Sequence, residues 1–176
     1  MRNSLFAFVL AASPAVAQTP DVGAIVDTHI LPGYQALAES TAALATTAEQ
    51  HCAASDPKLQ EAYGAGFDAW IAVSHLRFGP SEQGDRAFAL AFWPDSRGAT
   101  PKALGQMIRD EDPGVESLDS FQNVSIAARG FYAMEFLLYD DQFSTAGSEA
   151  YRCALIQVMS ADIAATSAAI LADWED

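Results

Sequence analysis

Apolar residues recur every three or four positions along most of the chain, the spacing that buries one face of an α-helix. Four stretches show this stripe: residues 21–53, 57–78, 119–139 and 156–174. Pro32 should kink the first helix or delay its start, and Gly79-Pro80 should end the second. Asp119 and Gln122 have the spacing of a capping box at the start of the third. The pattern predicts four helices.

Residues 81–117 connect the second and third predicted helices and are too many for a hairpin loop. Thr100-Pro101 fits a helix cap followed by a first-turn proline, which predicts a short helix through Arg109. Strand-like alternation is confined to Ala87–Phe92. Several residues are too apolar for a solvated linker: Phe88, Leu90, Phe92 and Trp93. We therefore expect an all-α fold, a four-helix bundle with a long crossover that contains a short extra helix.

Residues 1–17 have a different pattern. A short positive start precedes the apolar run Leu5–Ala12, and Ala15-Val16-Ala17 fits the small-residue cleavage site of a signal peptide. The prediction is a signal peptide over 1–17 and a helical domain over 18–176. Because no later apolar run reaches the length of a membrane span, we expect an exported protein of the periplasm or cell envelope with no membrane span.

The charge balance narrows the range of partners. The 176 residues include 9 Lys and Arg against 23 Asp and Glu, a net charge of −14 at pH 7. Nucleic acid is excluded as a partner, since there is no cationic surplus to neutralise phosphates. Cations and basic partners stay compatible with this charge, and acidity is also a common solubility device.

Two cysteines, Cys52 and Cys153, remain after the predicted cleavage. In an oxidising compartment two cysteines favour one disulfide, and the alternative is a pair of buried free thiols. In an idealised bundle with a full-length crossover, the end of the first helix and the start of the fourth meet at the same end. This topology favours a Cys52–Cys153 disulfide.

Residues 129–140 read RGFYAMEFLLYD and resemble the signature helix of the imelysin-like proteins, peptidase family M75, which are exported, iron-regulated bacterial proteins. The family motif there is G-x-H-x-x-E, matched by Gly130 and Glu135, with Tyr132 at the histidine position. Three further stretches are similar to the family: ILPGY at 30–34, AW…FGP within 69–80 and FWPD at 92–95. The resemblance implies half of a fold built from two related helical bundles, as a natural short form or a truncated one.

Tyr132 and Glu135 lie three residues apart and share a helix face. Their oxygens are hard donors that suit ferric iron or another divalent or trivalent metal, although the phenol must first lose its proton. In the alternative, Tyr132 is a core residue that bonds Glu135 or another helix, and a buried Glu135 then needs a partner such as Arg129 or Arg77. A second departure from the family is Ser74, which stands where relatives often carry a glutamate. Both departures remove expected metal ligands.

The remaining candidate site residues give weaker evidence of a metal or catalytic site. His29, His51 and His75 are isolated in sequence and lack the spacing of zinc ligands, so we expect surface or capped histidines. The acid groups 110–112 and 140–141 could attract Ca²⁺, but neither has the EF-hand spacing and both are expected to be solvated. No nucleophile has a base close to it in sequence.

Three functions follow from these observations. The first is a non-catalytic binding module linked to the uptake of iron or another metal. The second is an M75-type metallopeptidase, against which the missing histidine and glutamate argue, since a zinc hydrolase needs about three protein ligands. The third is a structural or interaction domain of the envelope. It would self-associate, or pack against a second bundle, through the outer faces of the first and last helices near Trp174.

Overall fold

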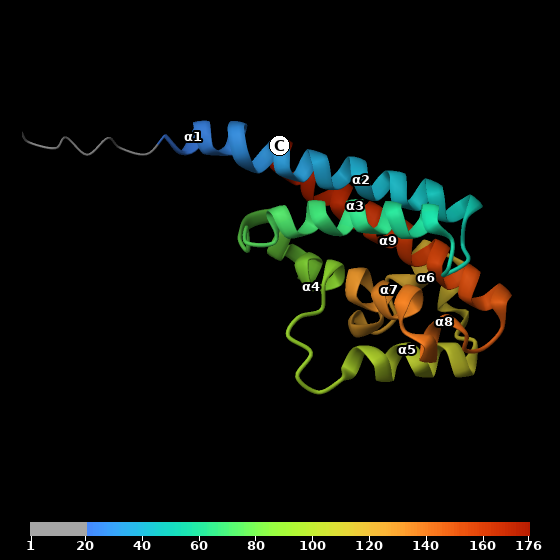
Figure 1. The fold of residues 1–176 in the computed structure, drawn as a ribbon. Coiled ribbons are helices and arrows are strands. Elements are labelled where there is room, and N and C mark those ends of the chain that lie inside the picture. The colour runs from blue at the N-terminus through green and yellow to red at the C-terminus, as the bar shows by residue number, and fades with distance from the viewer. Residues whose placement is uncertain (1–20) are drawn as a thin grey trace, which may run out of the picture.

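The computed structural model describes residues 21–176, and over that range the chain forms helices and no strands. Three long helices lie side by side: α2 (Leu31–Gln50), α3 (Pro57–Val73) and α9 (Glu149–Glu175), as Figure 1 shows. The helix α3 returns antiparallel to α2 after a short turn. The helix α9 is also antiparallel to α2, because its start is joined to Cys52 and its end packs on Tyr34. The predicted signal peptide lies outside the described residues.

The first predicted helix is continuous from Val22 to Gln50 but changes type along its length. The short helix α1 (Val22–Ile25) leads into the π-helical turn η1 (Val26–Ile30) and then into α2. Pro32 has no N–H to donate to the preceding turn, and the wide turn accommodates it, with the Leu31 N–H bonded to the Val26 carbonyl. The helix therefore passes Pro32 without a break.

The second predicted helix begins where expected and ends early. Asp56 caps α3 by accepting a hydrogen bond from the Lys58 N–H at 2.9 Å, with Pro57 in the first turn. The helix stops at Val73, ahead of Phe78. The chain then forms η2 (Gly79–Asp85) and α4 (Arg86–Leu90). The alternating segment 87–92 is thus mostly the helix α4 rather than a strand.

The predicted short helix is α5 (Ala99–Asp110), and its N-terminal cap is a different residue. The Asp95 carboxylate accepts hydrogen bonds from the Ala99 and Thr100 N–H groups at 2.7 and 2.8 Å. These bonds hold the pKa of Asp95 below its ordinary value. Thr100, expected to be the cap, is instead buried in the first turn of α5.

The third predicted helix, over 119–139, forms only in its second half. Short turns η3 (Pro113–Glu116), α6 (Leu118–Phe121) and η4 (Ile126–Ala128) precede α7 (Gly130–Tyr139), and α8 (Asp141–Ser144) follows. The predicted capping box at Asp119 is wrong, since the Ser117 hydroxyl accepts from the Ser120 N–H instead. The all-α class is confirmed, whereas the fourth long helix of a regular bundle is replaced by these shorter pieces.

The buried face of α2 matches the predicted stripe, and α9 supplies the opposite wall of the core. The fully buried side chains include Tyr34, Leu37, Leu44, Phe131, Leu155 and Ile156. The helix α9 is long and apolar enough to cross a membrane by length and composition, but half of that stretch is buried in the fold. The core helix of a folded domain has the same length and composition, and the buried residues of α9 belong to the hydrophobic core.

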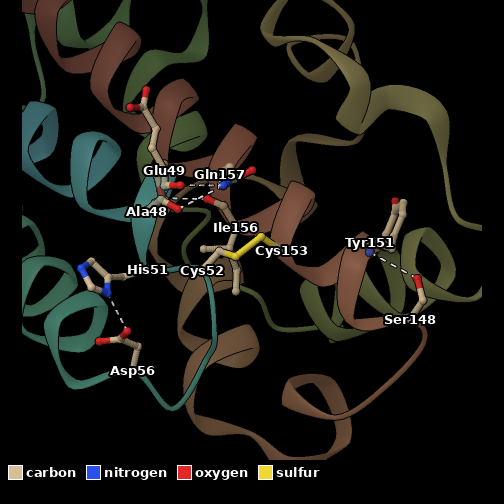
Figure 2. Close-up of a disulfide and its surroundings, with 11 residues drawn as sticks. Ala48, Glu49, His51, Cys52, Asp56, Ser148, Tyr151, Cys153, Ile156 and Gln157 are labelled. Atoms are coloured by element: carbon tan, nitrogen blue, oxygen red, sulfur yellow. Dashed lines mark hydrogen bonds and ion pairs between the residues drawn. A yellow bond between two sulfur atoms is a disulfide. The ribbon is translucent and has the colours of Figure 1, made fainter.

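The disulfide expected from the topology is present. Cys52 and Cys153 are bonded across 101 residues, with their Cα atoms 4.9 Å apart, and no free cysteine remains among the described residues. Figure 2 shows the bridge joining the end of α2 to the start of α9. Beside it, the Gln157 side-chain amide donates to the Ala48 and Glu49 carbonyls, both at 3.3 Å. These bonds secure the last turn of α2 against α9.

Trp174, near the end of α9, is half-buried. Its ring packs against Tyr34 and Phe78, with ring centroids 6.3 and 5.8 Å away, and it closely approaches Gly79. Six large apolar side chains are exposed among the described residues, and of these Phe78 packs against Trp174: Val22, Ile25, Ile71, Phe78, Trp93 and Tyr139. Self-association near Trp174 stays a prediction, and Phe78 is the exposed apolar side chain beside it.

Candidate functional site

The motif helix α7 starts at a glycine because no other residue fits there. Gly130 has a φ of +77°, in the left-handed region, and a Cβ atom on it would lie 2.3 Å from the carbonyl oxygens of both Ala89 and Leu90. Those carbonyls end α4, so α7 begins in contact with the C-terminal end of α4. The motif glycine thus has a structural role that sets where Tyr132 and Glu135 emerge.

The residue before α7 is fixed by a buried ion pair. Arg129 donates from Nε and Nη2 to the two Asp162 carboxylate oxygens at 2.9 and 2.7 Å. Its Nη1 donates to the Gln122 carbonyl at 3.2 Å. The Asp162 side chain is 1% exposed and that of Arg129 is 12% exposed. The pair ties the start of α7 to the middle of α9, and the expectation that Arg129 serves Glu135 is wrong.

Tyr132 is half-buried within an aromatic cluster. Its ring lies between Phe67 of α3 and Trp93, with centroids 5.9 Å from each. Among the hydrogen bonds of residues 21–176, none joins the Tyr132 hydroxyl to Glu135. At the position of the family histidine, the side chain therefore contributes aromatic packing.

Glu135, three residues after Tyr132 in α7, is exposed to solvent. It lines a surface hollow together with Phe136, Tyr139, Asp140, Asp141 and Gln142. The pKa values of Tyr63 and Tyr139 are raised, mainly by burial and next by the nearby Glu135 carboxylate. Arg77, the other expected partner, pairs with Glu82. Glu135 is thus an exposed acid rather than a buried one in need of an arginine.

Two other candidate oxygen donors, Asp140 in this hollow and Ser74 at the end of α3, already make hydrogen bonds. The Asp140 carboxylate accepts from the Gln142 N–H at 2.8 Å and caps α8. Ser74, at the position of the family glutamate, donates its hydroxyl to the Ile71 carbonyl at 3.0 Å. Within residues 21–176, no group of three or more His, Cys, Asp and Glu side chains is arranged to hold a metal. A cation in the hollow would be bound mainly by Glu135 and water.

The histidines are less isolated in space than in sequence. His51 Nδ1 lies 2.8 Å from an Asp56 carboxylate oxygen next to the disulfide, as expected of a capped histidine. His29 and His75 are exposed, as expected of surface histidines, and their Nε2 atoms are 3.2 Å apart. In an antiparallel hairpin of the first two helices, the start of the first lies beside the end of the second. This geometry places His29 near His75 and is the signal that could have predicted their pairing.

Comparison with known proteins gives a consistent family result. The family model described as imelysin, peptidase M75, matches residues 30–176. A crystal structure of an imelysin-like protein from Psychrobacter arcticum 273-4 is similar with a TM-score of 0.76 and 19% sequence identity. The match covers 87% of this chain and 48% of that one, so the chain spans about half the length of that protein. No curated protein matches.

Proposed function

Since the chain belongs to the imelysin family, peptidase M75, we propose that it is an exported module that binds iron or another hard metal cation without catalysing hydrolysis. The observation that carries the proposal is the position of Glu135. This residue, the acid of the family motif, is exposed in a surface hollow beside Asp140 and Asp141. Carboxylate oxygens are the ligands that hard cations prefer.

The chemistry of the motif helix favours binding over catalysis. A hydrolytic zinc site uses about three protein ligands and keeps one position open. Here tyrosine stands at the motif histidine, and serine stands at the family glutamate. Both changes replace strong zinc ligands by a phenol and a hydroxyl, and the phenol packs between two aromatic rings. A cation held by oxygens and water needs neither of the missing ligands.

Export is supported from two sides. The sequence of residues 1–17 fits a signal peptide, and the Cys52–Cys153 disulfide is compatible with an oxidising compartment. Cell fractionation with an antibody to the domain tests this part of the proposal. Recovery in the cytoplasm would reject export, and recovery in the periplasmic or envelope fraction would support it.

Metal analysis of the purified protein tests the binding role. The 18–176 chain is dialysed against ferric citrate, and bound iron is measured in the wild type and in Glu135→Gln. We expect iron in the wild type and much less in the variant. Glu39→Gln is the matched control, since Glu39 is another exposed helical glutamate, on α2. Equal iron in the wild type and Glu135→Gln, or peptide hydrolysis that rises with protein concentration, would reject the proposal.

The exposed aromatic residues favour a second candidate, an interaction domain. Trp93 is 65% exposed and Tyr139 is 52% exposed. Trp93 contacts Tyr132, and Tyr139 borders the Glu135 hollow. Apolar side chains gathered in this way are typical of a surface covered by a partner, and the partner proposed here is a second copy of the chain. Sedimentation of wild type and Trp93→Ser at about 100 µM, where micromolar dimers populate, is the test. A monomer in both would reject this candidate.

A further inference from the structure

Two histidines from different helices meet at the open end of the α2–α3 hairpin. His29 lies in the π-helical turn η1, and His75 follows the end of α3 by two residues. Their Nε2 atoms are 3.2 Å apart and their ring centroids 5.4 Å apart, with the planes tilted by 35°. Both side chains are exposed, so an ion can reach them from solvent.

The backbone on both sides of the pair is held in place. Tyr34 is fully buried and donates its hydroxyl to the Leu76 carbonyl at 3.3 Å, which fixes the residue after His75 against α2. A Cβ atom on Gly33 would lie 2.7 Å from a Val73 methyl group, so the two helices are in close contact here. The spacing of the two imidazoles is therefore set by packing rather than by the exposed rings themselves.

We propose that His29 and His75 together bind a divalent transition-metal ion of the Zn²⁺ class. Zinc–imidazole bonds of about 2.0–2.1 Å at tetrahedral angles place two ligand nitrogens roughly 3.3–3.4 Å apart. The observed Nε2–Nε2 distance of 3.2 Å is close to this ligand–ligand distance. Small rotations of the exposed rings bring both Nε2 lone pairs to one point. Water fills the remaining positions.

The proton balance of this step is simple. Without metal, one neutral imidazole donates its Nε2–H to Nε2 of the other. For both Nε2 atoms to bind the ion, the donor ring shifts to the tautomer that carries its proton on Nδ1, through exchange with water. Neither ring loses charge or gains a proton. The ion thus replaces one hydrogen bond by two metal–nitrogen bonds.

This site is independent of the function proposed above, because it uses nitrogen ligands and none of the residues around Glu135. Imidazole prefers borderline ions such as Zn²⁺, whereas carboxylates also bind Mg²⁺ and Ca²⁺. Bound metal at the hairpin end would join the start of α2 to the end of α3. Binding should therefore raise the melting temperature, because the ion binds the folded chain preferentially.

Calorimetric titration of the 18–176 chain with ZnCl₂ tests the site, in a buffer with excess MgCl₂ to occupy carboxylates. We expect the wild type to bind one Zn²⁺ per chain. His29→Gln and His75→Gln should each lower the Zn²⁺ affinity at least about tenfold, because losing even a residue that only hydrogen-bonds to a metal ligand lowers metal affinity by that factor. The double variant should bind at least as weakly as either single one, because no imidazole ligand remains. Added Zn²⁺ should raise the melting temperature of the wild type alone among these proteins.

The matched control is His51→Gln, which removes a histidine engaged with Asp56 and should keep the zinc affinity of the wild type. Glu135→Gln should also keep it, which separates this site from the Glu135 hollow. The proposal is overturned if the wild type binds no Zn²⁺ under these conditions. It is also overturned if His29→Gln and His75→Gln bind Zn²⁺ like the wild type, or if His51→Gln loses as much affinity as they do.

Discussion

Arg129 and Asp162 form a two-point ion pair between residues 33 apart in sequence, and the carboxylate has almost no contact with solvent. The arginine precedes the motif helix α7, and the aspartate lies inside α9. A buried pair of this kind contributes less to net stability than its geometry suggests, because both charges lose hydration. Breaking it is costly, since the remaining charge stays buried. The pair thus makes the position of α7 depend strongly on α9.

Asp162→Asn should lower the free energy of unfolding by about 3–5 kcal/mol, because the arginine keeps its charge and loses its carboxylate. Urea denaturation measures this. The control is Asp173→Asn, which breaks the more exposed pair with Arg86 and should cost at most about 1 kcal/mol. An apolar double variant, Arg129→Met with Asp162→Leu, should recover much of the loss. Equal costs for the two Asp→Asn variants would show that burial does not matter here.

Gly130→Ala should destabilise the fold by about 2 kcal/mol or more, since it combines a left-handed backbone with a Cβ atom 2.3 Å from two carbonyl oxygens. Gly64 is a matched control in α3. Its Cβ position has no neighbour within 4 Å, so Gly64→Ala should stabilise by up to about 1 kcal/mol. Thermal unfolding by circular dichroism compares the two. A stable Gly130→Ala protein would mean that α4 and α7 do not meet as described.

Helical periodicity predicted much of this fold because burial repeats along α2 and α9. Tyr34, Leu37 and Leu44 are all fully buried, as the stripe required. Periodicity failed between 119 and 129, since the break before α7 depends on Gly130 meeting the carbonyls of Ala89 and Leu90, a tertiary contact. No local pattern distinguishes that segment from a helix.

The candidate site was harder to predict for the same reason. Asp162 is adjacent to the apolar stripe of α9, and only the fold shows that it is buried opposite Arg129. Glu135 was placed on a helix face with Tyr132, but spacing alone could not say that the acid is exposed while the phenol packs between two rings. The Cys52–Cys153 bridge could be predicted, because helix direction alone determines which chain ends meet.

Because Cys52 and Cys153 are bonded to each other, thiol reagents should find no free thiol in the unfolded, unreduced protein. Because the bridge closes a loop of 101 residues, the chain-entropy treatment gives it about 4–5 kcal/mol of stabilisation. A Cys52→Ser, Cys153→Ser variant should therefore unfold at lower urea concentration. Thiol titration checks the first statement and urea denaturation the second. Two titratable thiols before reduction would contradict the bridge.

The cap of α5 should respond to acid. Hydrogen bonds from the Thr100 and Ala99 N–H groups hold the pKa of Asp95 below its ordinary value of 3.8. A carboxyl group with a lowered folded pKa stabilises the fold fully above its unfolded value and loses that contribution as pH falls through the folded value. Asp95→Ala should therefore be less stable than the wild type at pH 7, with the difference shrinking below about pH 4. Stability measured against pH checks this, and a constant difference would contradict it.

Tyr132→His should increase metal binding at the motif helix. The substitution restores the Gly-x-His-x-x-Glu pattern and places an imidazole three residues before Glu135, on the same helix face. A histidine and a glutamate at this spacing are a common ligand pair within helical bundles. The cost is the loss of the Tyr132 ring contacts with Phe67 and Trp93, so some stability should be lost as well.

Tyr132→Phe is the control, because it keeps the ring and cannot bind a metal. We expect Zn²⁺ affinity to rise in Tyr132→His within a His29→Gln, His75→Gln background, which removes the other candidate site, and to stay unchanged in Tyr132→Phe. Equal affinity in both variants would mean that Glu135 is too far from residue 132 to share an ion, and that the motif helix has lost more than one ligand.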